Sequence, residues 1–194
     1  MDKNNLHSLS QAWSISDSAS LYGLDRWGGN YFSINNAGHI SISPKGESGE
    51  KLDLKELVDE IEGRNLKLPL LIRFDDILED RLNEIHHAFQ TAITTYNYTG
   101  NYQGVFPVKC NHQRHVVEEL MACGKPWSLG LEVGSKAELL IGLSLIESDK
   151  ALLICNGYKD RRYIETTILA RQLGLRPIVV IEQADEVERI ISAS

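Results

Sequence analysis

From residue 68 onward, short and almost continuously apolar runs alternate with longer segments of helical periodicity. In the first of these longer segments, Leu78, Leu82 and Ile85 recur at the three- and four-residue spacing of a single helix face. The alternation then repeats along the rest of the sequence. It predicts strands at 68–74, 103–108, 128–132, 151–155 and 176–181, and helices at 77–95, 113–123, 135–146, 160–173 and 184–194.

Five nearly apolar strands that alternate with five helices are typical of parallel βαβ units. Right-handed crossovers allow such units to form either a doubly wound sheet or a barrel. A complete eight-stranded barrel needs about 250 residues, and the alternation is still running where this sequence of 194 residues stops. We therefore expect an α/β fold that is either a small open sheet or the front part of something longer.

Residues 1–65 have a different character, because they are rich in Ser, Asn and Gly. The segments 22–23 and 27–30 are typical of turns, and 31–34 and 39–42 alternate around an Asn-Asn-Ala-Gly sequence that favours a hairpin. Asp53 is placed to cap a short helix at 54–61 that ends near Gly63. We expect two parts, an N-terminal extension with a β-hairpin at 1–65 and a βα domain at 66–194.

Composition excludes several functional classes. The net charge of −7 leaves no basic stripe for nucleic acid, and no apolar run approaches the length of a membrane span. Residues 1–5 lack the apolar core of a signal peptide. The three cysteines are an odd number without close pairing, which argues against a disulfide framework and fits a reducing cytoplasm. We expect a cytoplasmic protein that binds neither nucleic acid nor membranes.

Polar residues follow each predicted strand, where parallel sheets gather their chemistry. Lys109 follows the second strand, Glu132 ends the third, and Asn156 follows the fourth. The other members of this set are Arg73, Asp75, Asp76, Asn111, Gly134, Ser135, Gly157, Tyr158, Lys159 and Glu182. A lysine, a carboxylate and an amide from neighbouring strands should therefore meet on one rim.

Lys109 is the residue with the most specific chemistry in this set. Taken alone it reads as a surface lysine that ends a strand, since lysine is mostly exposed. A partly desolvated lysine can instead lose its proton and act as an amine nucleophile that forms a Schiff base. Glu132 beside it would orient the amine or balance its charge. The agreement in position of the two residues weighs more than either residue taken alone, and both interpretations stay open at this point.

Other candidate sites are weaker. Cys110, His112 and His115 resemble part of a zinc motif, but no second cysteine pair supports it, so we assign no metal ligands. His86 and His87 are neighbours on a helix and cannot share a face, which favours surface positions. The sequence has no phosphate-binding Walker loop, no Gly-x-Gly-x-x-Gly turn and no Gly-x-Ser-x-Gly elbow.

Several motifs resemble one family. The run Phe-Pro-Val-Lys-Cys-Asn at 106–111 is similar to the cofactor-lysine motif of the barrel-type pyridoxal-phosphate decarboxylases, and 130–139 resembles their third-strand motif. Within that group, the segments at 22–28, 68–74 and 155–160 are similar to the biosynthetic arginine decarboxylases. The tryptophan-containing segment at 22–28 separates them from ornithine and diaminopimelate decarboxylases. The resemblance runs from about residue 21 to residue 194.

The resemblance implies an eight-stranded barrel joined to a β-rich domain, of which this sequence would hold the first five βα units. It implies pyridoxal 5'-phosphate and Mg²⁺ as cofactors, conversion of L-arginine to agmatine and carbon dioxide in polyamine and spermidine biosynthesis, and a homo-oligomer. By position, Lys109 would be the catalytic, cofactor-bound lysine. Glu132 matches the acidic residue near the cofactor, and Asn156 is counted as cofactor-binding with them.

The family pattern is incomplete in this sequence. Its chains are several times longer, and its phosphate-binding glycine loop, its acid for the pyridine nitrogen and the residues lent across its dimer come later. We expect these residues to be a fragment that is inactive alone. The alternatives are a non-catalytic, pyridoxal-phosphate-binding or regulatory half-barrel that pairs with another chain, and an unstable product of a truncated gene.

Overall fold

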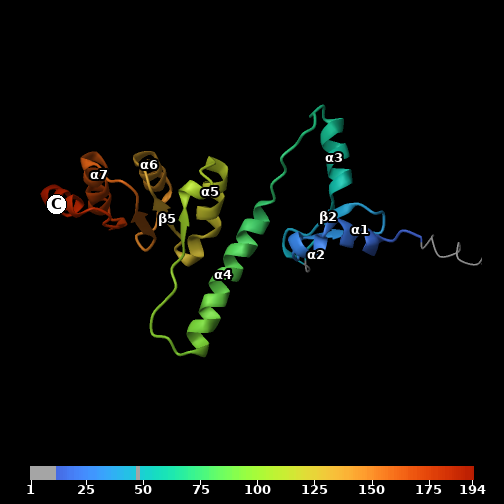
Figure 1. Ribbon diagram of the computed structural model, residues 1–194, viewed down its shortest axis with the longest axis horizontal. Helices are drawn as coiled ribbons and strands as arrows, with labels where there is room; N and C mark the ends of the chain where they lie inside the picture. Colours follow the sequence, from blue (N-terminus) through green and yellow to red (C-terminus); the bar gives the residue numbers. More distant parts are fainter. Residues whose placement is uncertain (1–11, 47–48) are drawn as a thin grey trace, which may run out of the picture. The chain divides into compact units, whose positions relative to one another are not determined.

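The computed structural model describes residues 12–46 and 49–194, which form two compact units with a boundary between Asp80 and Arg81 (Figure 1). Residues 1–5, which argued against a signal peptide, lie outside the described residues. Within the described part of the chain, no helix is both long and apolar enough to cross a membrane. The predicted division at 65/66 stays a prediction.

The first unit combines helices with a small antiparallel sheet. Its sheet has the order β1-β2-β3, with Phe32 opposite Ile42 and Ile34 opposite Ile40, which confirms the predicted hairpin. Helices α1 and α2 replace the run of turns expected around residue 23. The elements are α1 (Ile15–Tyr22), α2 (Leu24–Trp27), β1 (Phe32–Ile34), β2 (Ile40–Ile42), β3 (Leu52–Asp53) and α3 (Leu54–Gly63).

Helix α1 begins at a capping box. The Ser14 hydroxyl accepts a hydrogen bond from the Asp17 backbone N–H at 3.2 Å, and the Asp17 carboxylate accepts one from the Ser14 N–H at 2.8 Å. The helix ends at Gly23, whose left-handed φ of 63° suits glycine. The polar composition of this segment gave no helical periodicity to predict the helix from, although the Ser-x-x-Asp spacing is typical of a helix start.

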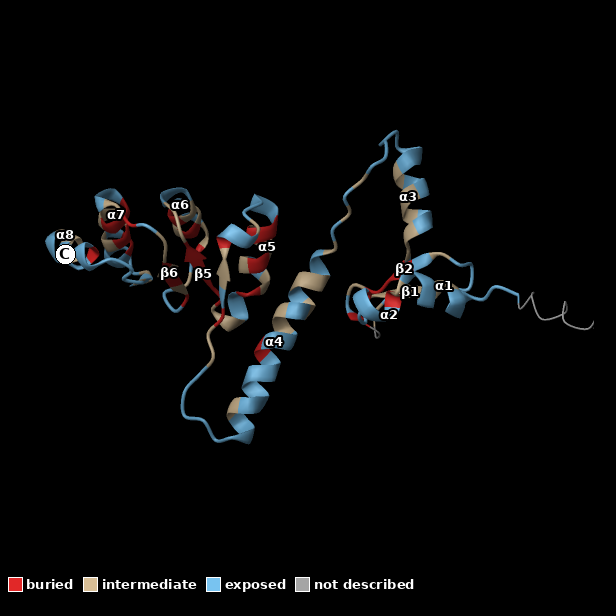
Figure 2. Ribbon diagram, in the orientation of Figure 1, coloured by how far each residue is buried: buried red, intermediate tan, exposed pale blue. Residues whose placement is uncertain are grey.

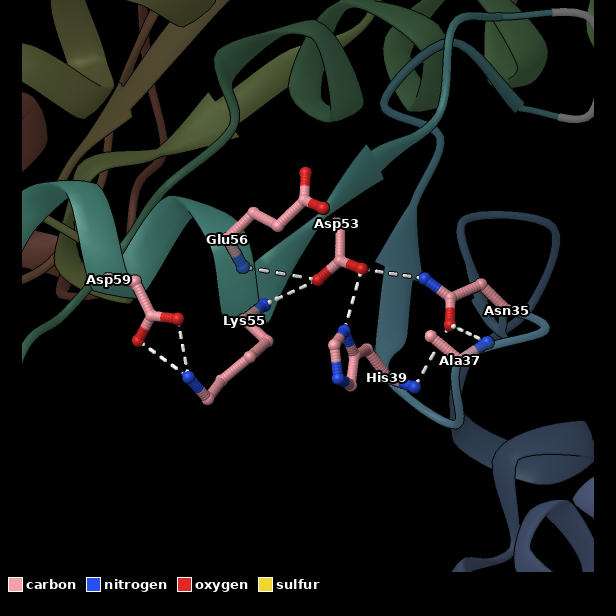
Figure 3. A network of polar contacts seen from close by, with 7 residues as sticks. All are labelled: Asn35, Ala37, His39, Asp53, Lys55, Glu56 and Asp59. Carbon is pink, nitrogen blue, oxygen red and sulfur yellow. Dashed lines mark hydrogen bonds and ion pairs between the residues drawn. The ribbon is translucent and has the colours of Figure 1, made fainter.

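Asp53 joins the hairpin to helix α3 (Figure 3). As the predicted N-cap, its Oδ1 accepts hydrogen bonds from the backbone N–H of Lys55 at 2.8 Å and of Glu56 at 3.2 Å. Its Oδ2 accepts one from Asn35 Nδ2 at 2.7 Å and lies 2.8 Å from His39 Nδ1. One carboxylate therefore fixes both the start of α3 and the hairpin beside it.

The sequence predicted a strand at 68–74, and for these residues the prediction is wrong. In the structure, residues 68–74 form neither strand nor helix, and Leu71 is exposed. An apolar run becomes a strand only where a neighbouring strand completes its backbone hydrogen bonds, and none of the described strands pairs with this run. Helix α4 (Asp75–Thr95) follows it, as predicted.

The second unit contains a four-stranded parallel sheet with the order β4-β5-β6-β7. A doubly wound sheet reverses its strand order at a switch point, and no reversal occurs within these four strands. Figure 1 shows α5, α6 and α7 following one another along the sheet. The elements are β4 (Val105–Pro107), α5 (Arg114–Cys123), β5 (Gly130–Val133), α6 (Lys136–Leu145), β6 (Leu152–Cys155), α7 (Arg161–Gln172), β7 (Arg176–Val179) and α8 (Ala184–Ala193), with short 3-10 turns η2 (Val108–Cys110) and η3 (Lys125–Trp127).

The core of the second unit centres on β5, whose four residues are all buried (Figure 2). Leu131 and Val133 pack with apolar side chains from the helices that flank the sheet. Burying a side chain of this size stabilises the fold by about 1.5–3 kcal/mol. The other members of the cluster are Val108, Val117, Leu139, Ile146, Ala151, Leu153, Cys155, Tyr163 and Ala170.

Substitution of Gly130 tests how closely β5 and β6 approach. A Cβ at this position would lie 2.2 Å from the Leu152 carbonyl oxygen, so Gly130→Ala should lower the free energy of unfolding by about 2–3 kcal/mol. At Gly63, the last residue of α3, a Cβ would have no neighbouring heavy atom within 4 Å. Gly63→Ala should leave stability unchanged or raise it slightly. Urea unfolding measures both, and equal effects would contradict the close approach.

The Asp53 network predicts a pH dependence of the first unit's stability. Partial burial acts to raise the pKa of Asp53, but hydrogen bonds from His39, Glu56, Asn35 and Lys55 outweigh it and lower the pKa from 3.8 to about 2. Because folding lowers this pKa, the ionised carboxylate stabilises the fold above about pH 4, and the contribution is lost as the pH falls towards about 2.

Asp53→Asn provides the comparison, because its side chain does not titrate. The difference in unfolding free energy between the wild-type chain and Asp53→Asn should be largest near neutral pH and shrink between about pH 4 and about pH 2. Urea unfolding followed by circular dichroism measures this difference. A difference that stays constant over that range would show that the carboxylate does not carry the stabilisation.

Candidate active site at the strand ends

Lys109 lies in the 3-10 turn that directly follows β4. Val108, the residue before it, is fully buried in the core and anchors the turn, while the Lys109 side chain is 64% exposed. The sequence predicted a strand through residue 108, whereas β4 ends at Pro107. The turn therefore places the Lys109 amine beyond the carboxyl end of β4, at the edge of the sheet.

Glu132 lies on β5 in register with Pro107 of β4. Its Oε1 is 3.8 Å from Lys109 Nζ, so the structure brings the predicted pair together. The Glu132 side chain is only 11% exposed, and neither carboxylate oxygen accepts a hydrogen bond from any described residue. A buried carboxylate without hydrogen bonds is costly. Glu132 therefore offers two open acceptor atoms beside an exposed amine.

Asn156 lies at the end of β6, one strand further along the rim. Its backbone N–H donates a hydrogen bond to the Val133 carbonyl at 2.8 Å. Its half-buried side chain makes no hydrogen bond with Lys109 or Glu132 in the part of the chain that the structure describes. The structure thus places Asn156 on the same edge as the pair without joining it to them.

Two glycines of the predicted rim set, Gly134 and Gly157, shape this rim. Gly157 has a left-handed φ of 70°, and a Cβ there would lie 2.4 Å from the Gly134 carbonyl oxygen. The Gly134 N–H donates to Glu138 Oε2 at 2.7 Å, and Ser135 caps helix α6. The loops after β5 and β6 are therefore in backbone contact. The Asn-Gly sequence at 156–157 was the available signal.

Other predicted rim residues lie in the first unit or make hydrogen bonds within their own loops. Asp76 belongs to the first unit, where its carboxylate pairs with Lys45 at 3.3 Å. Asn111 Oδ1 accepts a hydrogen bond from the Gln113 N–H at 3.1 Å, just before α5. Arg73 and Asp75 also lie in the first unit, and Glu182 donates its N–H to Glu186. The core of the candidate site is the pair Lys109 and Glu132.

The prediction that His86 lies on the surface is wrong. His86 is buried and its ring stacks on Trp127, with centroids 4.8 Å apart and an interplanar angle of 12°. Burial, with a smaller contribution from the charge of His87, lowers the pKa of His86. Trp127 comes from the distant turn η3, so the helix pattern alone did not reveal this contact. His87 is exposed, as predicted.

The zinc pattern at Cys110, His112 and His115 does not form a site. Cys110 is exposed. Among residues 12–46 and 49–194, no three His, Cys, Asp or Glu side chains converge in a way that would hold a metal ion.

A parallel βα sheet that presents a lysine amine against a buried, open carboxylate has the groups needed to hold an aldehyde cofactor. The chain belongs to the pyridoxal-dependent decarboxylases: the family described as "Pyridoxal-dependent decarboxylase, pyridoxal binding domain" matches residues 79–194. This confirms the family resemblance found in the sequence motifs. The match covers the second unit and the end of the first.

Individual relatives share a narrower description. The chain is 72% identical over 185 residues to a protein of Parasynechococcus marenigrum named "Biosynthetic arginine decarboxylase", covering 95% of this chain and 29% of that protein. It is 62% identical to a relative of the same name from Prochlorococcus marinus, covering 100% of this chain and 30% of that protein. The chain thus spans about three tenths of the length of these curated relatives.

A solved structure agrees with this assignment. The crystal structure of the biosynthetic arginine decarboxylase of Campylobacter jejuni is similar with a TM-score of 0.81 and 33% identity. The similarity covers 88% of this chain and 28% of that one. The chain therefore has an α/β fold that matches part of an arginine decarboxylase, with the parallel four-stranded and antiparallel three-stranded sheets described above.

The residues present fit pyridoxal phosphate. Lys109 supplies an exposed amine, and Glu132 supplies carboxylate oxygens that have no other hydrogen-bond partner among the described residues. Such an unsatisfied buried group is expected where a ligand completes the hydrogen bonding. The same test gives no support for Mg²⁺, because no cluster of carboxylates converges within the described ranges.

Substitution of Glu132 tests whether its carboxylate is a cost to the folded chain. Glu132→Met removes a buried group without hydrogen bonds, so the free energy of unfolding in the absence of cofactor should rise by about 1 kcal/mol. Glu138→Met is the matched control, because it removes the acceptor of the Gly134 N–H and should lower stability by a similar amount. Urea unfolding measures both. An equal loss of stability in the two variants would contradict the hypothesis that the Glu132 carboxylate destabilises the folded chain.

Proposed function

We propose that this chain is part of the cofactor-binding portion of an arginine decarboxylase, which converts L-arginine to agmatine and carbon dioxide in polyamine and spermidine biosynthesis. The observation that carries the proposal is Lys109 Nζ at 3.8 Å from the buried Glu132 carboxylate. The substrate rests on the relatives, which are named biosynthetic arginine decarboxylases. We propose a cytoplasmic location and, for the complete enzyme, a homo-oligomer on the same resemblance.

Each residue of the site has a defined task in this proposal. Lys109, the catalytic residue, holds the cofactor covalently through its Nζ amine. Glu132 orients that amine and balances positive charge near it. Asn156 contributes a polar contact to the cofactor from the end of β6. When bound, pyridoxal phosphate supplies a ring that accepts the electron pair left when a carboxyl group departs as carbon dioxide.

The fold proposal is more detailed than the four strands described. We propose that β4 to β7 are consecutive strands of an eight-stranded barrel, and that residues 68–74 add a strand when their neighbours are present. The chain would then hold the first five βα units after a hairpin-bearing extension at 1–65. The unreversed strand order supports this arrangement.

A second candidate function is a non-catalytic half-barrel that binds pyridoxal phosphate and pairs with another chain. The observation in its favour is the outer edge of the sheet at β7, where Ile178 in the strand and Val180 and Ile181 after it are exposed. An unpaired apolar edge is available to a neighbouring chain. Both functions predict no turnover from these residues alone. They differ in the complete protein, where only the decarboxylase converts arginine to agmatine.

Borohydride reduction tests the cofactor lysine. The purified chain is incubated with pyridoxal phosphate, reduced, digested and analysed by mass spectrometry. The label should concentrate on Lys109 and disappear in Lys109→Met, because that amine, among the lysines that the structure describes, is the one paired with the buried carboxylate of Glu132. Lys125→Met, which removes an exposed lysine that pairs with the exposed Glu147, should not change the labelling.

Label spread evenly over the lysines of both variants would contradict the assignment. Portions of the same preparations that were neither reduced nor digested are incubated with arginine and assayed for agmatine. We expect none from these residues alone, since the matched relatives are more than three times as long. Clear turnover would refute the claim of inactivity, and would at the same time exclude the half-barrel.

A further inference from the structure

A buried ion pair connects the loop after β6 with the loop after β7. Lys159 Nζ lies 3.4 Å from Glu186 Oε1, and both side chains are 0% exposed. Lys159 comes three residues after Asn156, and Glu186 lies in the first turn of α8. The sequence had placed Lys159 on the rim with the candidate site residues. The structure places its charge inside the fold instead.

Both members of the pair hold backbone atoms of their loops. Lys159 Nζ also donates a hydrogen bond to the Gly157 carbonyl oxygen, and the Lys159 carbonyl accepts one from Arg189 Nη1 at 3.1 Å. Glu186 Oε2 accepts hydrogen bonds from the N–H groups of Glu182 at 2.9 Å and Gln183 at 3.4 Å. The pair is therefore the centre of a network that fixes two loops.

The surroundings of Glu186 favour its charged form. Burial acts to raise the pKa of Glu186, but the backbone hydrogen bonds and Lys159 outweigh it, so its pKa is lowered. Buried ion pairs nevertheless add little net stability compared with apolar residues of similar volume, because both charges lose their hydration. What this pair supplies beyond stability is the fixed position of the groups that it binds.

Those groups belong to the candidate cofactor site. The Gly157 peptide is held from one side by Lys159 and from the other by its backbone contact with Gly134. The adjoining Asn156 N–H is bonded to Val133, which follows Glu132 directly. Displacement of Lys159 would therefore move the rim next to Glu132.

We infer that Lys159 and Glu186 are positioning residues that hold the 156–157 segment in the conformation needed to bind the cofactor. This inference rests on the proposed function, since it concerns the same site. It assigns the pair no contact with substrate or cofactor.

Three variants test the inference. Lys159→Met removes the buried ammonium, and Glu186→Gln removes one charge while retaining an oxygen that can accept the backbone hydrogen bonds. Glu186→Gln keeps the test decisive if Lys159→Met fails to fold. Lys125→Met is the matched control, because it breaks an exposed ion pair (3.1 Å from Glu147) in the same unit.

Two measurements are made on each folded variant, well below its melting temperature. Hydrogen exchange follows the amides of residues 156–159, 182 and 183 without cofactor. Borohydride labelling of Lys109 measures the fraction of chains that carry the cofactor as the concentration of pyridoxal phosphate is raised. We expect Glu186→Gln to speed exchange at both loops and to raise the half-saturating cofactor concentration about tenfold, the effect of one lost charge-assisted hydrogen bond. Lys125→Met should change neither.

The outcomes separate this inference from the proposed function. If the wild-type chain labels Lys109 and the folded variants label it at the same cofactor concentration, the pair is merely structural and the inference is overturned, while the proposed function stands. Faster exchange without a change in half-saturation overturns the inference in the same way. If the wild-type chain does not label Lys109, the proposed function fails and this inference fails with it.

Discussion

The parallel register between β4 and β5 is the constraint on which the candidate site depends. Because Pro107 pairs with Glu132, the turn that follows β4 leaves the sheet directly above the carboxylate. A shift of one residue would move Glu132 to the other face of β5. Leu131 and Val133 oppose such a shift, because it would remove them from the apolar cluster and turn the Glu132 carboxylate towards it. Packing in the core thus determines the chemistry at the edge.

Glu132 shows how this core accommodates a functional group at a cost. Every residue of β5 is buried, yet one of the four is a carboxylate without a hydrogen bond from the described residues. Its nearest charge, Lys109, remains largely in solvent and so compensates it only in part. Local rules for strand residues are broken at this position, which is what is expected at a site that a ligand completes.

Features that depend on local spacing could be predicted from the sequence. The helices after each strand, the Asp53 cap and the rim position of Lys109 and Glu132 follow from periodicity and from the parallel βα pattern. Features that depend on distant residues could not. The burial of His86 requires Trp127, and the segment at 68–74 requires a neighbouring strand. Lys159 looked like a rim residue because its partner, Glu186, lies on another helix.

The distance along the chain between Lys159 and Glu186 also orders events during synthesis. Lys159 is translated before Glu186. The residues of β6 and the start of α7 are therefore synthesised before the carboxylate that pairs with the Lys159 ammonium. An unpaired ammonium is held in water by its hydration. The ion pair at Lys159 can therefore form only after the first turn of α8 has been made, although the residues around Asn156 are translated earlier.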